Sequence, residues 1–182
     1  MQALDGDKRY GFVTIINHWF AAVLIIGMLG LGLYMADLPK GPWKGELFGI
    51  HKSFGIMVLL LGAMRIGWRL GNVWPGPLAE TPAWQHKAAR LLHLLLLAMM
   101  LALPLSGWAM SSAGDHPVSF FGLFTLPPLL MADEALAEIL TAVHETLAWT
   151  LIAMLALHVG AALRHHFIAH DATLRRMLGR AS

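Results

Sequence analysis

Four long apolar stretches dominate the chain, and shorter, more polar segments separate them. A helix that crosses the hydrocarbon core of a bilayer needs about 20 mostly apolar residues. We therefore expect four transmembrane helices, at about residues 12–35, 47–70, 88–110 and 140–167. Prolines interrupt the connections, which indicates loops. Because every loop is short, we expect residues 1–182 to form a single all-α domain, a four-helix transmembrane bundle.

The composition supports a membrane protein and excludes several other classes. Hydrophobic residues make up 57% of the chain and charged residues 13%, against about 45–50% and 25% in soluble domains. A net charge of +2 is too small for a nucleic-acid-binding protein, which must neutralise many phosphates. The absence of cysteine excludes disulfides, iron–sulfur clusters held by thiolates and covalently attached haem.

The basic residues predict the orientation of the bundle. If the N-terminus lies in the cytoplasm, only Lys40, Lys44 and Lys52 of the 13 Lys and Arg residues lie outside. The others lie inside, from Lys8 near the start of the chain to Arg180 near its end. Because an excess of Lys and Arg marks cytoplasmic loops, we expect both termini in the cytoplasm. The first apolar stretch is too long for the core of a signal peptide, so we expect a retained helix.

Ten histidines in so apolar a chain require an explanation. His144 and His158 are separated by about 21 Å of helix rise and close to four turns, so they share one face at opposite depths. His18 matches the depth of His158, and His51 matches that of His144. Haem iron in an electron carrier takes two axial ligands, and neutral imidazole is a common one. The spacing therefore predicts two haems, each held by one of these pairs.

Other interpretations of the histidines are weaker. A single His near a helix end more often forms an interfacial hydrogen bond than a metal bond, but it does not account for two matched pairs. Zinc prefers about four ligands at one depth, and these side chains are spread over two. The 11 methionines are better explained as packing residues than as haem ligands.

At these residues the sequence resembles the bacterial cytochrome b561 family, which consists of four-helix membrane proteins with two haems. The resemblance covers nearly the whole chain. Its motifs are Asn17-His18-Trp19, Ile50-His51-Lys52-Ser53-Phe54-Gly55, Arg65 with Arg69, His93 with Ala102-Leu103-Pro104 and Gly107, His144-Glu145-Thr146-Leu147-Ala148, and Leu157-His158 with His165-His166.

The resemblance implies roles for these residues. His18 and His158 would hold an inner haem b and His51 and His144 an outer one, as the depths also indicate. The family reduces ubiquinone in the bacterial inner membrane, which makes His93, His165 and Arg69 candidates for the quinone site. The alternative for the two histidines is an interfacial hydrogen bond or, for His165, a contact with a haem propionate.

Two sets of basic residues have both a functional and a structural interpretation. Arg65 and Arg90, with Arg69, are candidates for binding the propionates of the inner haem, and the alternative is simple anchoring at the cytoplasmic surface. Lys40, Lys44 and Lys52 cluster near His51. They are either a solvated loop or a positive field that steers a small anion such as superoxide.

The leading functional hypothesis is an oxidoreductase that transfers electrons from a periplasmic donor, superoxide, to the ubiquinone pool, as some members of the resembled family do. The alternative is a haem-b subunit that relays electrons for a partner dehydrogenase or hydrogenase. A bundle without haem, structural or transporting, requires that the histidine pattern be a coincidence. The sequence does not fix the physiological donor or the oligomeric state.

Overall fold

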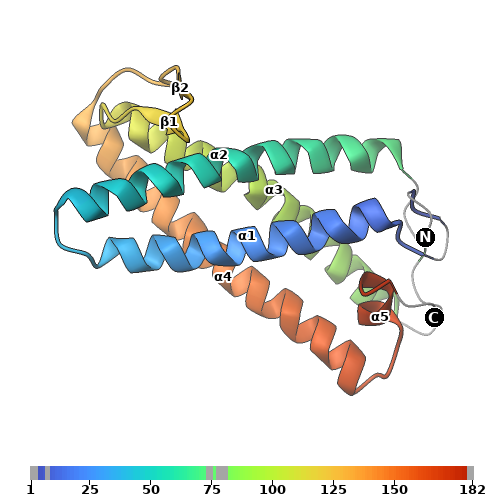
Figure 1. Ribbon diagram of the computed structural model, residues 1–182. Helices are drawn as coiled ribbons and strands as arrows, with labels where there is room; N and C mark the ends of the chain where they lie inside the picture. Colours follow the sequence, from blue (N-terminus) through green and yellow to red (C-terminus); the bar gives the residue numbers. More distant parts are fainter. Residues whose placement is uncertain (1–3, 7–8, 73–75, 77–81, 180–182) are drawn as a thin grey trace.

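The computed structural model describes residues 4–6, 9–72, 76 and 82–179. Four long helices run along the molecule, and the short helix α5 follows them (Figure 1). Each of the four is long and apolar enough to cross a membrane, which confirms the predicted four-helix transmembrane bundle. The bounds of the helices are α1 Phe12–Ala36, α2 Pro42–Gly71, α3 Ala83–Ala113, α4 Glu134–Phe167 and α5 Thr173–Met177.

The helices extend beyond the apolar stretches that predict them. α2 begins at Pro42, where proline is favoured because the first turn needs no N–H donor. α4 begins after Asp133, whose side chain caps the helix by accepting a hydrogen bond of 3.0 Å from the backbone N–H of Leu136. His51 therefore does not start its helix, and His144 is not at the end of its own. Both lie more than two turns inside, so their depths still match.

The helices pack in chain order, α1 on α2, α2 on α3 and α3 on α4. A small cluster of Ala21, Val58 and Met100 forms the buried centre. α2 and α3 approach closely there, because a Cβ at Gly62 would lie 3.0 Å from the Cβ of Met100. Pro104 interrupts α3 one turn later, and proline removes the hydrogen bond that the Met100 carbonyl would otherwise accept. Among the described residues, neither α1 nor α2 packs closely against α4.

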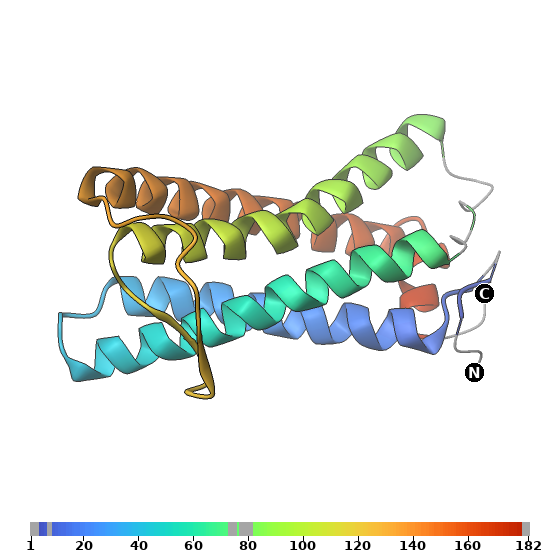
Figure 2. The same ribbon diagram turned by 90° about the horizontal axis from the view of Figure 1, so that it is seen from above.

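The connection between α3 and α4, predicted to be a loop, contains a β-hairpin. Strands β1 (Val118–Phe120) and β2 (Phe124–Leu126) pair antiparallel, and the hairpin lies across α2 near one end of the bundle (Figure 2). Ser53 of α2 holds it. Its hydroxyl oxygen accepts a hydrogen bond of 3.0 Å from the N–H of Phe121 and lies 3.0 Å from the Ser119 carbonyl.

The described residues nearest the two termini lie at the same end of the bundle (Figure 1), as an even number of spans requires. Helix α5 folds back toward α1 there, and the indole Nε1 of Trp19 donates a hydrogen bond of 2.9 Å to the Met177 carbonyl. Lys8 and Arg180, which contribute to the predicted charge asymmetry, lie outside the described residues.

Ser53→Ala tests the attachment of the hairpin. The substitution leaves the Phe121 N–H without its acceptor, so we expect a loss of about 1–3 kcal/mol of stability and faster hydrogen exchange at that amide. Hydrogen exchange and thermal unfolding of the detergent-solubilised protein measure both effects. Thr141→Ala is the matched control, because its exposed hydroxyl bonds only the Ala137 carbonyl of its own helix. Equal effects of the two substitutions would contradict the attachment.

Candidate functional site

The structure brings together both histidine pairs that the sequence predicts. The ring centroids of His18 on α1 and His158 on α4 are 6.1 Å apart. Those of His51 on α2 and His144 on α4 are 6.4 Å apart. Helix α4 thus supplies one member of each pair, at two depths in the bundle.

These separations fit two imidazoles on opposite sides of one metal ion. A bond between a metal and an imidazole nitrogen is about 2.0–2.1 Å long, and a five-membered ring with bonds of about 1.33 Å has its atoms about 1.1 Å from its centre. Two rings bound in line to one ion therefore have centroids about 6.3 Å apart. The observed 6.1 and 6.4 Å agree with this value.

The arrangement of the helices around the histidine pairs also leaves room for a large prosthetic group such as haem. The histidines join α1 to α4 and α2 to α4, which are helices that do not pack closely on each other in the described part of the chain. Two glycines leave room for the rings of the outer pair. A Cβ at Gly107 would lie 3.0 Å from Cε1 of His144, and one at Gly32 would lie 3.3 Å from Cε1 of His51. Because the haem of an electron carrier takes two axial ligands, of which imidazole is a common one, and an apolar slot, these residues fit haem b.

The two members of the outer pair differ in their remaining contacts. Nδ1 of His144 lies 2.9 Å from the hydroxyl oxygen of Ser106 on α3. Nδ1 of His51 is buried and has no hydrogen-bond partner among the described residues. In the outer pair, the ring of His144 therefore has a hydrogen-bond partner on a neighbouring helix, and the ring of His51 has none among the described residues.

The inner pair lies beside other titratable side chains. A guanidinium nitrogen of Arg65 is 3.3 Å from Nδ1 of His18, and the ring of His93 is 5.4 Å from that of His158, centroid to centroid. Because a guanidinium only donates hydrogen bonds, Nδ1 of His18 acts as an acceptor in this contact. An imidazole that binds iron through Nε2 carries its proton on Nδ1. If His18 held haem iron in this way, Arg65 would have to pair with another acceptor, such as a propionate.

Two of the three quinone candidates lie near each other, because Arg69 is close enough to interact electrostatically with His93. His93 contacts the ring of His158, whereas Arg69 lines a pocket between α1 and α2. Nδ1 of His165 lies 2.5 Å from Oδ2 of Asp171. Burial would raise the pKa of the Asp171 carboxyl, but hydrogen bonds from Thr173 and His165 outweigh it and the pKa is lowered.

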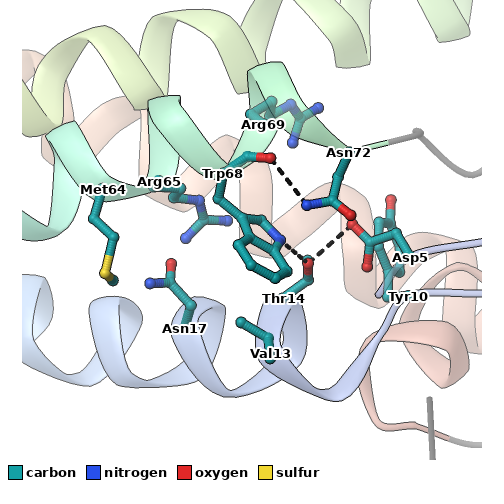
Figure 3. Close-up of a pocket in the computed structure, with 10 residues that line it drawn as sticks. All are labelled: Asp5, Tyr10, Val13, Thr14, Asn17, Met64, Arg65, Trp68, Arg69 and Asn72. Carbon is teal, nitrogen blue, oxygen red and sulfur yellow. Dashed lines mark hydrogen bonds between the residues drawn. The ribbon is translucent and has the colours of Figure 1, made fainter. Parts of the chain in front are cut away.

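The pocket beside Arg69 lies at the cytoplasmic ends of α1 and α2 as the sequence orients them. A chain of hydrogen bonds crosses it, from the indole of Trp68 to the hydroxyl of Thr14 and on to the carboxylate of Asp5 (Figure 3). Arg65 also lines it. Its volume of about 70 Å³ is small beside the 300–1,000 Å³ of typical ligand sites.

The other basic candidates lie near the two ends of the bundle. Nζ of Lys44 donates hydrogen bonds to the carbonyls of Ala36 and Leu38 at 3.1 and 2.7 Å. Nζ of Lys52 donates one of 3.2 Å to the Pro117 carbonyl. Both lysines therefore hold loop backbone next to the outer pair as well as carrying charge there. Lys40 and Arg90 are exposed.

Sequence reasoning did not single out Ser106 or Asp171. Ser106 interrupts an otherwise apolar segment of α3, and a polar side chain inside a bilayer usually has a partner. That signal was present, but it does not say which histidine the hydroxyl would reach. Asp171 follows α4 in a short connection, where an isolated carboxylate predicts no particular contact.

Comparison with known proteins agrees with this arrangement. Residues 9–180 match the family described as prokaryotic cytochrome b561. The chain belongs to the prokaryotic cytochrome b561 family. This confirms the resemblance seen in the motifs. It also makes the protein a multi-pass membrane cytochrome of the b type, with a role in electron transfer.

Three relatives match this cytochrome b561 over almost its whole length. Cytochrome b561 homolog 2 of Escherichia coli (strain K12) is 38% identical over 100% of this chain and 97% of its own. Cytochrome b561 homolog 1 of the same organism is 34% identical over 95% of this chain and 98% of its own. The probable superoxide oxidase CybB of Yersinia pestis is 30% identical over 94% of this chain and 96% of its own.

Gly107→Ala tests whether the space beside His144 matters for haem binding. The added Cβ would lie 3.0 Å from Cε1 and 3.3 Å from Nδ1 of the ring, so the ring must move away. We expect haem affinity at this site to fall by about tenfold or more, the usual effect of disturbing the surroundings of a metal ligand. Haem content and the absorption spectrum of the purified cytochrome measure it. Gly27→Ala is the control, because a Cβ there meets open space. Equal haem content in the two variants would argue against the close fit.

Proposed function

We propose that this cytochrome b561 holds two b-type haems, one between His18 and His158 and one between His51 and His144. The observation that supports this most strongly is the pair of ring separations, 6.1 and 6.4 Å, at two depths of one bundle. When bound, the haems supply one-electron redox chemistry. The protein supplies the imidazoles, the apolar surroundings and access for electron donor and acceptor.

We infer that the cytochrome is a superoxide:ubiquinone oxidoreductase. The match to the probable superoxide oxidase CybB over 94% of this chain supports the assignment. In the overall reaction, two superoxide anions each lose one electron and leave as O₂. One ubiquinone takes up the two electrons and two protons and becomes ubiquinol.

On the donor side, Lys40, Lys44 and Lys52 create a positive field beside His51 and His144. Such a field attracts a small anion and raises its rate of encounter, an effect that salt weakens. Lys44 and Lys52 are held in place by loop carbonyls, so their charges have a fixed position. This favours steering of superoxide toward the outer site.

On the acceptor side, Arg65 and Arg90 are the proposed partners of the inner haem propionates. The contact between Arg65 and His18 supports this for Arg65, since it must find another acceptor when His18 binds iron. His93, His165 and Arg69 remain the quinone candidates. Of these, His165 is paired with the carboxylate of Asp171, and a histidine with such a partner can pass a proton to a quinone oxygen.

We further propose that residues 1–182 form a single domain in the bacterial inner membrane, with both termini in the cytoplasm. The distribution of Lys and Arg supports this orientation. It places Lys40, Lys44 and Lys52 in the periplasm, where they face the proposed donor.

The second candidate function is a haem-b anchor that relays electrons for a partner dehydrogenase or hydrogenase. The connections between the described helices favour the independent enzyme. The hairpin between α3 and α4 packs on α2 (Figure 2), and α1 and α2 are joined by a few residues, so these two described connections form no separate docking domain.

Substitution of single ligands tests the pairing. We expect His144→Ala and His18→Ala each to lose one haem and keep the other, because the two sites share no ligand. Haem content and redox titration of the purified variants measure this. His116→Ala, which removes an exposed histidine outside the pairs, should keep both haems. If His144→Ala and His18→Ala lose the same haem, the proposed pairing is wrong.

Rapid mixing with superoxide tests the reaction. We expect the purified cytochrome to be reduced by superoxide without any partner protein, and to form ubiquinol when ubiquinone is present. The rate should fall as ionic strength rises, because the steering field is screened. Haem reduction followed by absorbance and ubiquinol measured by chromatography give the two readouts.

Two results would contradict the proposed superoxide:ubiquinone oxidoreductase activity. One is haem that stays oxidised in superoxide. The other is reduction only in the presence of a co-purified dehydrogenase or hydrogenase, which would establish the relay.

A further inference from the structure

The hydroxyl of Ser106 occupies a defined place between two helices. Its oxygen lies 2.7 Å from the carbonyl of Leu103 on its own helix and 2.9 Å from Nδ1 of His144 on α4. The side chain is partly buried, in a part of α3 whose neighbouring side chains are apolar. The serine therefore links the α3 backbone to one ring of the outer pair.

The directions of these two hydrogen bonds follow from the available protons. A carbonyl only accepts, and a hydroxyl has one proton, so Ser106 donates to Leu103. The contact with His144 then requires the ring to donate from Nδ1 to the hydroxyl oxygen. This leaves the Nε2 lone pair of His144 available to a metal, which is the form that a ligand needs.

His51 and His18 have no comparable acceptor among the described residues. Nδ1 of His51 is buried without a partner in the described part of the chain. Nδ1 of His18 faces the guanidinium of Arg65, which cannot accept. Ser106 thus gives His144 a support that its partner across the outer site lacks.

We propose that Ser106 is a positioning residue that fixes the Nδ1-protonated form and the orientation of His144 and lowers the reduction potential of the outer haem. This rests on the proposed function, in which His144 is an axial ligand. A hydrogen bond from Nδ1 to an acceptor makes the imidazole a stronger electron donor, as at other metal sites. A stronger donor stabilises ferric over ferrous iron.

The contact with Leu103 strengthens this effect. A hydroxyl that donates to a carbonyl becomes more negative at its oxygen and a better acceptor. Gly107, the next residue along α3, lets the ring approach, because any side chain there would meet His144. Ser106 and Gly107 therefore act together. The hydroxyl of Ser106 accepts the hydrogen bond from His144, and Gly107, which has no side chain, leaves space for the ring.

The test compares Ser106→Ala with Ser106→Thr in the haem-loaded protein. We expect Ser106→Ala to raise the ratio of ferrous to ferric iron at the outer site about 3–10-fold at fixed potential, in line with the loss of one hydrogen bond. This is about 28–59 mV for a one-electron couple. Ser106→Thr keeps the hydroxyl and should stay near wild type. The inner haem should not shift. The outer haem is identified as the one that His51→Ala loses.

Thr150→Ala is the matched control. Its hydroxyl lies on the exposed side of α4 and, like that of Ser106, donates to a carbonyl of its own helix, at 2.8 Å from Thr146, but no hydrogen bond joins it to a histidine of the pairs. An outer-haem potential that is unchanged or lower in Ser106→Ala would overturn the proposal, and so would an equal shift in Thr150→Ala.

A second measurement covers the case in which Ser106→Ala loses the outer haem. Loss in Ser106→Ala with retention in Ser106→Thr supports the positioning role, and loss in both contradicts it. NMR of the haem-free protein labelled with ¹⁵N-histidine should show the Nδ1–H form of His144 in wild type and a smaller share of it in Ser106→Ala, where the Leu103 carbonyl remains beside the ring. The spectrum tests the hydrogen bond even if the protein proves to bind fewer than two haems, so failure of the proposed function remains distinguishable.

Discussion

The arrangement depends on the cost of placing an imidazole inside a hydrocarbon layer. Such a side chain needs a partner. His144 contacts the Ser106 hydroxyl and the ring of His158 contacts that of His93, both on the neighbouring helix α3, and the two rings also face His51 on α2 and His18 on α1. Each pair thereby joins helices that do not pack closely on each other in the described part of the chain. Among the described residues, helix α4 packs mainly against α3, and its two histidines face α1 and α2.

The two pairs have different surroundings, and the difference agrees with the proposed direction of electron flow. The outer pair is enclosed by Gly32, Gly107 and Ser106, so its rings are held by shape and by a neutral hydroxyl. The inner pair lies among groups that carry charge or protons, including Arg65 and His93. A donor that brings only an electron needs a site such as the outer pair, without groups that exchange protons. An acceptor that also takes up protons needs a site such as the inner pair.

The sequence predicts the four spans and the matched histidine depths because both follow from the helix rise and the length of apolar runs. It does not predict where α2 and α4 begin, because Pro42 and Asp133 extend these helices beyond their apolar parts. The hairpin at 118–126 was missed because its three-residue strands are too short for an alternating pattern. The contact between Ser106 and His144 depends on the rotation of α3 against α4, which spacing along one helix cannot reveal. The three quinone candidates were grouped by the family resemblance. In the structure Arg69 interacts electrostatically with His93, and His165 pairs with Asp171.

The central claim is that four histidines hold two haems in one chain. The most direct measurement is the ratio of haem b to protein in the purified wild-type cytochrome, from the pyridine haemochrome spectrum and quantitative amino-acid analysis. The histidine pairs predict two haems per chain. A ratio of one, at full loading, would contradict the claim and leave one pair as a contact between uncoordinated rings.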